Sequence, residues 1–208
     1  MELYEAMRTA VTTRLFTGDD VGDEVLTRVL DNARFAPNGG NRQGWHVVVV
    51  RDRSTRLELA RLYREPYEQY MRERYGRTIP EEPELPVDVF AARLGEIPVH
   101  LVFCALLESL ALTDASLDRV SIVGGASIYP FAQNVLLGLR AEGLGAAMTT
   151  MVVVHEPAVV ELLGIPPGYA VACHVLVGVR ADPFPTKLTR APVAEFTSLD
   201  RWGATYTP

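Results

Sequence analysis

Four consecutive valines at residues 47–50, preceded by Trp45 and His46, constrain the fold more than any other feature of the chain. An apolar run without alternation fits a strand covered on both faces better than one with a solvated face. Three more apolar segments of strand character occupy residues 97–107, 146–154 and 169–179. Because helical patterns lie between them, we expect a sheet flanked by helices.

Apolar spacing and terminating residues predict four helices. The first covers residues 23–34, and the second, short and amphipathic, covers 54–63. A third, at 120–140, is apolar nearly all round, so we expect it both in the core and in a subunit interface. A fourth lies within 155–167, with proline in its first turn and glycine beyond its last.

The length of 208 residues favours one domain over residues 1–208. Residues 61–96 interrupt the alternating pattern, because they are charged, rich in tyrosine and broken by prolines. We interpret this segment as a lid, the alternative being a merely solvated helix and loop. The tail at 180–203 is punctuated by proline and is expected to wrap over a surface.

Composition excludes several classes of protein. A net charge of −6 argues against sequence-independent binding of nucleic acid. Cys104 and Cys173 lie in apolar runs, so the chain shows no zinc pattern and no disulfide framework. Polar residues and Pro130 within 120–140 argue against a membrane span. The acidic, amphipathic N-terminus does not resemble a signal peptide, so we expect a cytoplasmic protein.

Common catalytic motifs are also missing. The chain has no G-x-S-x-G, and Val159 stands where a zinc protease motif starting at His155 needs its second histidine. The sequence GLGAAM follows a predicted helix, which is wrong for a dinucleotide fingerprint. A chain without a nucleophile, a metal site or an obvious base, yet with amide-rich loops, suggests that a bound cofactor carries the chemistry.

Two patterns near the N-terminus carry a family resemblance. T-x-R-x-F precedes the first predicted helix, and A-P-x-x-x-N-x-Q-x-W follows it. The matching positions are Thr12, Arg14, Phe16, Ala36, Pro37, Asn41, Gln43 and Trp45. With QNVLLGLRAEGLGAAMTT and KLTRAP downstream in the right order, the chain resembles the FMN-dependent nitroreductase family over nearly its whole length except 61–96.

The resemblance implies an α+β fold of three layers, α/β/α, with a central mixed, mainly antiparallel sheet flanked by helices. It also implies an obligate homodimer with two FMN molecules in the interface and a C-terminal tail that extends over the partner subunit. FMN has a phosphate, ribityl hydroxyls and a flat ring, and such a ligand needs guanidinium groups, amides and small residues around it.

The resemblance assigns the polar loop before the first strand to flavin that is bound mainly by the other subunit. Its residues are Pro37, Asn38, Gly39, Gly40, Asn41 and Gln43. The alternative is that this segment is only a polar turn.

The phosphate and the N1/O2 edge of the ring are assigned to the two ends of the chain. Thr12 matches a hydroxyl position at the phosphate, and Arg14 matches a basic residue near N1 and O2, where its charge favours reduced flavin. The family commonly has an arginine two residues before that hydroxyl, whereas this chain has Ala10. Lys187 and Arg190 match the basic tail that holds the phosphate in the family. The alternative is that they are a solvated surface pair. Arg8 is a further candidate to compensate for the arginine missing at position 10.

Strand residues Met148, Thr149 and Thr150 match those that the family places along the reactive edge of the ring. Many members have glutamate at the third position, where this chain has Thr150. A backbone N–H or a threonine hydroxyl there can hydrogen-bond to flavin N5, so Thr149 and Thr150 are the candidate catalytic residues. The alternative is that two β-branched residues simply suit a strand.

The function implied is an FMN-dependent oxidoreductase that takes hydride from NADH or NADPH and reduces nitroaromatics, quinones or similar flat, electron-poor small molecules by a ping-pong mechanism. No metal is expected. One alternative on the same fold is reductive dehalogenation or flavin fragmentation. Another is a non-enzymatic dimer that sequesters flavin, which would be favoured if Tyr63, Tyr67 or Tyr70 sealed the ring.

Overall fold

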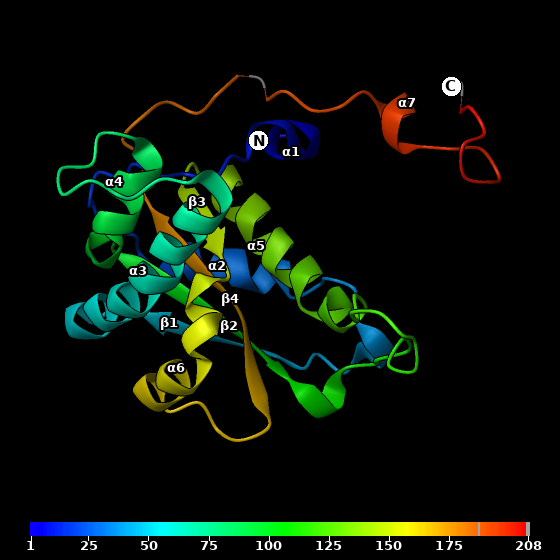
Figure 1. The fold of residues 1–208 in the computed structure, drawn as a ribbon, viewed down its shortest axis with the longest axis horizontal. Helices are drawn as coiled ribbons and strands as arrows, with labels where there is room; N and C mark the ends of the chain where they lie inside the picture. The colour runs from blue at the N-terminus through cyan, green and yellow to red at the C-terminus, as the bar shows by residue number, and fades with distance from the viewer. Residues whose placement is uncertain (187, 207–208) are drawn as a thin grey trace.

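The computed structural model describes residues 1–186 and 188–206. Its centre is a four-stranded sheet in the order β1-β2-β4-β3, in which every neighbouring pair is antiparallel (Figure 1). The strands are β1 (Trp45–Val50), β2 (Val99–Leu106), β3 (Gly145–Thr149) and β4 (Tyr169–Gly178). A parallel bridge between Thr12 and Ala146 adds the N-terminal segment beside β3. The sheet is therefore mixed and mainly antiparallel, as predicted.

Helices cover both faces of this sheet. They are α1 (Leu3–Thr9), α2 (Asp23–Ala33), α3 (Arg53–Tyr75), α4 (Pro86–Ala92), α5 (Tyr129–Ala141), α6 (Glu156–Leu163) and α7 (Val193–Phe196). Short 3-10 turns occupy Gly39–Asn41, Leu94–Glu96, Leu107–Ser109, Gly124–Ser127 and Met151–His155. The predicted helices near 23–34 and within 155–167 are confirmed as α2 and α6.

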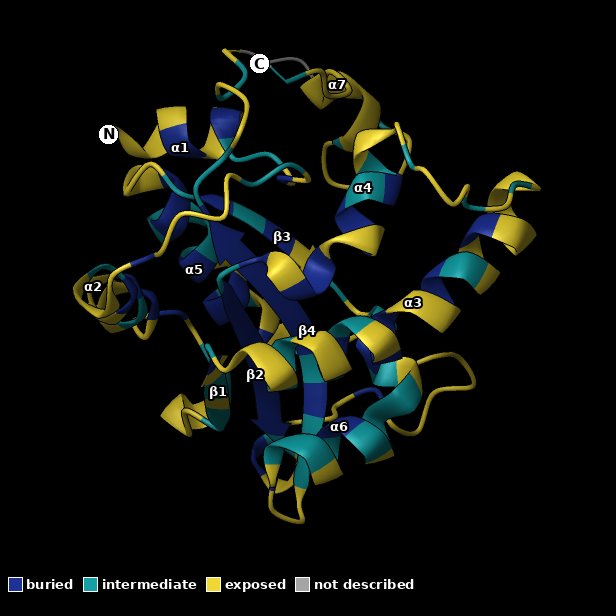
Figure 2. Cartoon of the chain, turned by 90° about the vertical axis from the view of Figure 1, so that its left-hand side faces the viewer, coloured by how far each residue is buried: buried dark blue, intermediate teal, exposed yellow. Residues whose placement is uncertain are grey.

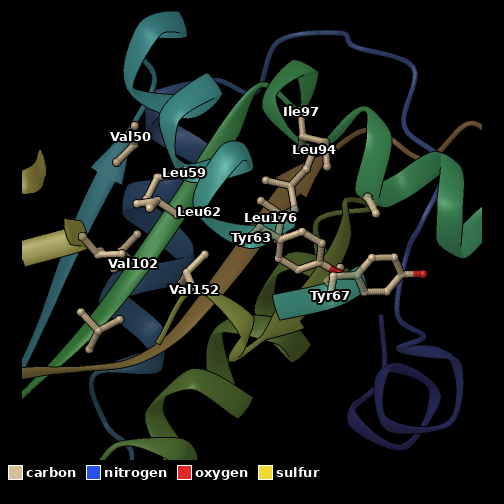
Figure 3. Packing of buried hydrophobic residues seen from close by; sticks show 14 of the residues in the cluster. Val50, Leu59, Leu62, Tyr63, Tyr67, Leu94, Ile97, Val102, Val152 and Leu176 are labelled. Atoms are coloured by element: carbon tan, nitrogen blue, oxygen red, sulfur yellow. The ribbon is translucent and has the colours of Figure 1, made fainter. Parts of the chain in front are cut away.

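The sheet separates two hydrophobic cores, because successive side chains of a strand point to opposite faces. In β2, Leu101 and Phe103 pack against α2 and α5, whereas Val102 packs against the layer of α3, α4 and α6. The buried sheet lies between these helical layers (Figure 2). Figure 3 shows the second core, where Leu59 and Leu62 of α3 meet side chains of the sheet. The predicted three-layer α/β/α architecture is confirmed.

The valine-rich strand packs against both hydrophobic cores, although it lies at the edge of the sheet. β1 pairs only with β2 and is the edge of the sheet. Val50 is buried, but His46 and Val49 are exposed. Even so, Val48 and Val50 pack into the core of α3, α4 and α6, and Trp45 and Val47 pack against the core of α2 and α5. The prediction that both faces of the strand are covered is confirmed for these four residues.

The apolar segment at 120–140 forms a shorter helix than predicted. α5 begins at Tyr129, with Pro130 in its first turn, where proline needs no N–H partner. The chain before it is a loop held by Asp114, whose carboxylate accepts hydrogen bonds from Ser121 Oγ at 2.8 Å and from the Ile122 amide at 3.0 Å. The core part of the prediction is confirmed, since the inner face of α5 is buried.

Residues 61–96 contribute to the core, and the helix predicted at 54–63 is too short. α3 continues to Tyr75 through Pro66, and Gly76 ends it in a left-handed conformation at φ 62°. Tyr63 and Tyr67 are buried in the core shown in Figure 3, and Phe90 belongs to the same core. A helix can pass through proline when packing on both sides outweighs the lost hydrogen bond. That this segment acts as a lid on a single domain stays a prediction.

After β4 the chain leaves the three layers and runs outside them towards α7 and the C-terminus (Figure 1). None of the helices in the described residues is long and apolar enough to cross a membrane.

Candidate functional site

The N-terminal segment forms an additional edge beside β3 and thereby places two predicted site residues. The amide of Thr13 donates to the carbonyl of Ala146 at 2.8 Å, and the side chain of Thr13 is fully buried. Because extended residues alternate in direction, Thr12 and Arg14 point the other way and are exposed. Both therefore face the groove in front of β3.

Two cavities share this groove, and Thr12 and Met148 line both of them. The larger one, the tyrosine cavity, has a volume of about 790 Å³ and includes Arg14 and Thr149. Its opposite wall comes from α3 and the loop after it and carries the four tyrosines Tyr63, Tyr67, Tyr70 and Tyr75.

The smaller one, the arginine cavity, has a volume of about 320 Å³. Its polar lining comes from the N-terminal segment, α5 and the tail, and comprises Thr12, Gln133, Arg140 and Arg190. The two cavities adjoin at Thr12 and Met148, with the four tyrosines, Arg14 and Arg77 around the larger one and Arg140, Arg190 and Phe184 around the smaller one.

The predicted flavin residues are thus brought together only in part. Thr12, Arg14, Met148, Thr149 and Arg190 line the two cavities. Thr150 is exposed and lines neither. Lys187 lies outside the described residues.

The polar loop at 37–43 lies at the opposite end of α5. The amide of Gly39 donates to Ser127 Oγ at 3.0 Å, just before α5 begins, whereas the arginine cavity is lined by Gln133, Leu136 and Arg140 further along this helix. None of the residues at 37–43 lines either cavity, so the loop does not contribute to the groove of its own subunit. Asn38 Oδ1 instead accepts the amide of Gln43 at 2.9 Å. Pro37, Gly40 and Asn41 likewise line neither cavity.

Thr149 ends β3 and turns the chain. Its Oγ1 accepts a hydrogen bond from the amide of Met151 at 3.2 Å, and a 3-10 turn follows where the sequence predicted more strand. Since the oxygen accepts this bond, the hydroxyl proton can donate to a ligand in the tyrosine cavity.

A buried carboxylate that sequence analysis missed fixes the far wall of the tyrosine cavity. Asp88 of α4 is fully buried, pairs with Arg77 and accepts the Tyr67 hydroxyl at 3.0 Å. Tyr63 and Tyr67 stack with ring centres 5.4 Å apart. Burial raises the pKa of both phenols above the ordinary value, so both remain protonated. No local motif marks the hydrogen bond between Tyr67 and Asp88, because the two residues are 21 positions apart in the sequence.

Arg140 is the other residue that sequence analysis missed. It lies in the last turn of α5 and is buried. Its Nε donates to Thr9 Oγ1 at 2.9 Å, and its guanidinium carbon lies 3.8 Å from the ring centre of Phe184. The only sequence signal was its place in the RAEGLG segment, inside the helix that carried the family resemblance.

The fold and the site define the class of this protein. It is a three-layer α/β/α protein with a polar and aromatic groove along β3. The protein belongs to the nitroreductase family, whose model matches residues 7–179. Members of this family are oxidoreductases that typically depend on flavin.

Relatives of known sequence are distant. A protein of Archaeoglobus fulgidus with the provisional name NADH dehydrogenase/NAD(P)H nitroreductase is 24% identical over 183 residues, which is 87% of each chain. A similarly named protein of Methanothermobacter thermautotrophicus is 26% identical over 149 residues, covering 72% of this chain and 61% of the relative. Human iodotyrosine deiodinase 1 is 23% identical over 201 residues, covering 96% of this chain and 67% of the human protein.

Solved structures share the fold. A BluB-like flavoprotein from Clostridium difficile 630 superposes with a TM-score of 0.72 at 20% identity, covering 97% of this chain and 100% of the other. A provisionally named NADH dehydrogenase/NAD(P)H nitroreductase from Parabacteroides distasonis gives a TM-score of 0.70 at 18% identity, covering 96% and 98%.

Proposed function

We propose that the protein is an FMN-dependent oxidoreductase that takes hydride from NADH or NADPH and reduces nitroaromatics, quinones or similar flat, electron-poor molecules by a ping-pong mechanism. The observation that carries this proposal is the continuous groove along β3, in which the arginine cavity and the tyrosine cavity meet at Thr12 and Met148. A ligand with an anionic end and a flat aromatic end matches this division, and FMN is such a ligand.

The arginine cavity fits a phosphate. Arg190 contributes a guanidinium group, and its only hydrogen bond among the described residues is to the carbonyl of Thr189 at 2.7 Å. Thr12 adds an exposed hydroxyl beside it. Guanidinium groups bind phosphate through charge-assisted hydrogen bonds, which are about twice as strong as neutral ones.

The tyrosine cavity fits the ring and its reaction partner. Bound FMN would supply the two-electron chemistry, accepting hydride from the nicotinamide and returning electrons to the acceptor. Arg14 would stabilise the negative charge that develops on reduction, and the Thr149 hydroxyl would donate a hydrogen bond to a ring nitrogen. Facing tyrosines favour flat substrates, because aromatic rings stack on one another. Thr150, which lines neither cavity, stays a prediction as a catalytic residue.

A homodimer is part of the proposal. Val120 and Ile122 are 85% and 76% exposed in the single subunit, and the loop at 37–43 reaches no groove of its own. A second copy would cover the apolar loop and bring Pro37, Asn38, Gly39, Gly40, Asn41 and Gln43 to the flavin. The proposal also includes the tail over the partner subunit and a cytoplasmic location.

Light scattering tests the assembly. We expect a dimer at micromolar concentration, with an interface of more than roughly 2,000 Å² of total buried area. A monomer that still binds flavin would contradict the dimeric site.

Anaerobic mixing tests the activity. We expect the purified protein to show flavin absorbance bands, to bleach with excess NADH or NADPH, and to regain its colour over repeated cycles when a nitroaromatic or a quinone is added. An FMN-loaded protein that bleaches with neither nicotinamide would contradict the reductase function.

Reductive dehalogenation is the second candidate. The similarity to human iodotyrosine deiodinase 1 extends over 96% of this chain, which favours this alternative over flavin fragmentation. Release of halide from an iodinated phenol by the reduced protein, without turnover of nitroaromatics or quinones, would select it. The non-enzymatic sequestering dimer is less well supported, because Tyr70 and Tyr75 are exposed and do not seal the tyrosine cavity of the subunit.

A further inference from the structure

Arg140 is buried and has no anionic partner among the described residues. Only 9% of the residue is exposed, and no carboxylate of the described residues lies within 4.0 Å of its guanidinium group. Two half-buried arginines have carboxylate partners, since Arg51 pairs with Asp23 and Arg77 pairs with Asp88. Two others, Arg56 and Arg180, donate instead to carbonyl and hydroxyl oxygens. The terminal nitrogens of Arg140 are not sealed inside the protein but open into the arginine cavity, where an anion could pair with the charge.

The guanidinium group of Arg140 is held in a fixed orientation. Its Nε donates to Thr9 Oγ1, which in turn donates to the carbonyl of Glu5 at 2.7 Å. The guanidinium carbon of Arg140 also lies over the ring of Phe184. Among the described residues, the two terminal nitrogens of Arg140 have no hydrogen-bond partner, so both can donate to a ligand in the arginine cavity.

Ala10 has a small side chain and lines the same cavity as Arg140. Arg190 and Thr12 line it as well. A guanidinium group therefore enters the arginine cavity from α5, although position 10 has lost the arginine that the family resemblance led us to expect there.

We propose that Arg140 binds the phosphate of FMN and takes over the role of the arginine that is missing at position 10. This inference rests on the proposed function. Arg140 from α5 and Arg190 from the tail approach the cavity from different elements, so together they can hold a dianion with hydrogen bonds from more than one direction. Arg140 would make the site selective for flavin that carries a phosphate.

The test compares FMN with riboflavin, which lacks the phosphate, by quenching of flavin fluorescence on titration into flavin-free protein. Arg140→Gln should weaken FMN binding about ten- to a hundredfold, as expected for loss of hydrogen bonds to a charged group, and should change riboflavin binding less than twofold. Arg140→Lys should recover part of the FMN affinity. The double variant Ala10→Arg/Arg140→Gln should recover more, because it returns a guanidinium group to the cavity.

Arg28→Gln is the matched control. It removes the same charge from an exposed surface pair with Glu142 and should leave both affinities unchanged. Circular dichroism should show that each variant is folded, and if Arg140→Gln is not, the Arg140→Lys comparison carries the test. Unchanged FMN binding, or equal weakening of FMN and riboflavin in either folded variant, would overturn the role of Arg140. A wild type that binds neither flavin would instead overturn the proposed function together with this inference.

Discussion

Thr12 and Ala146 form a parallel bridge that attaches the N-terminal segment to the outer edge of β3. This pairing brings together two parts of the chain separated by more than half its length. It also decides which side chains face the groove, because Thr13 turns into the core and its neighbours Thr12 and Arg14 turn outward.

Gly145→Ala tests this pairing. A Cβ at position 145 would lie 2.7 Å from Thr13 Oγ1 and 2.6 Å from Arg180 Cγ, so the N-terminal segment would have to move. We expect a loss of about 1 to 3 kcal/mol in the free energy of unfolding, as for other overpacked sites, together with weaker FMN binding. Denaturant titration and flavin titration measure the two effects. Gly22→Ala, whose Cβ would meet only the movable end of Glu24, should change FMN binding little.

Arg14→Ala should retain substantial flavin but slow its bleaching by NADH or NADPH. The reason is that the positive charge stabilises the reduced flavin more than the oxidised form. Stopped-flow absorbance under anaerobic conditions measures the rate, and Arg14→Lys should preserve much of it. An Arg14→Ala variant that bleaches as fast as the wild type would remove Arg14 from the reaction.

Arg190→Ala should weaken FMN binding by about 1.5 to 3 kcal/mol, the usual contribution of a hydrogen bond to a charged group. Riboflavin binding should not change. The two flavins are titrated into the same protein preparation, and equal weakening of both would show that Arg190 does not contact the phosphate.

Asp88→Ala should destabilise the wall of the tyrosine cavity. The substitution removes the partner of Arg77 and the acceptor of the Tyr67 hydroxyl, which leaves buried polar groups unpaired. We expect the free energy of unfolding to fall by about 2 to 4 kcal/mol in urea titrations. Glu96→Ala, which breaks the exposed pair with Arg93, should cost less than about 1 kcal/mol and serves as the control.

Stability should fall in mild acid because of a buried histidine pair. The rings of His100 and His174 lie 4.8 Å apart, and burial lowers the pKa of His100 to about 3 and that of His174 well below its ordinary value. Below pH 6.5 the unfolded chain binds protons that the folded chain does not, so folding becomes less favourable as the pH falls. For His100 alone the loss between pH 7 and pH 5 is about 2 kcal/mol.

The measurement is urea unfolding at a series of pH values. His174→Leu should flatten the dependence of stability on pH between 7 and 5, because one of the two depressed groups is gone. A wild type whose stability does not change over this interval would contradict the buried, neutral state of both rings.

Local sequence was sufficient to predict much of the fold. The residues of β2, β4, α2 and α6 carry strong apolar patterns or clear terminators such as Gly164, and these signals are decided within a few residues. The motif around Thr12 and Arg14 indicated the family. The resemblance to that family then predicted the α/β/α architecture and the candidate flavin-binding residues.

Tertiary structure decided the rest, because it depends on contacts between residues far apart in the chain. Pro66 lies within α3 although local rules place a break there, since packing of Tyr63 and Tyr67 in the core holds the helix. Arg140 is an unremarkable helical residue in the sequence, and its place in the arginine cavity follows only when α5 lies beside Thr9 and Ala10. The pattern of apolar and polar residues along the chain indicates which face of a helix or strand is buried. Which residues pack against that face depends on the tertiary structure.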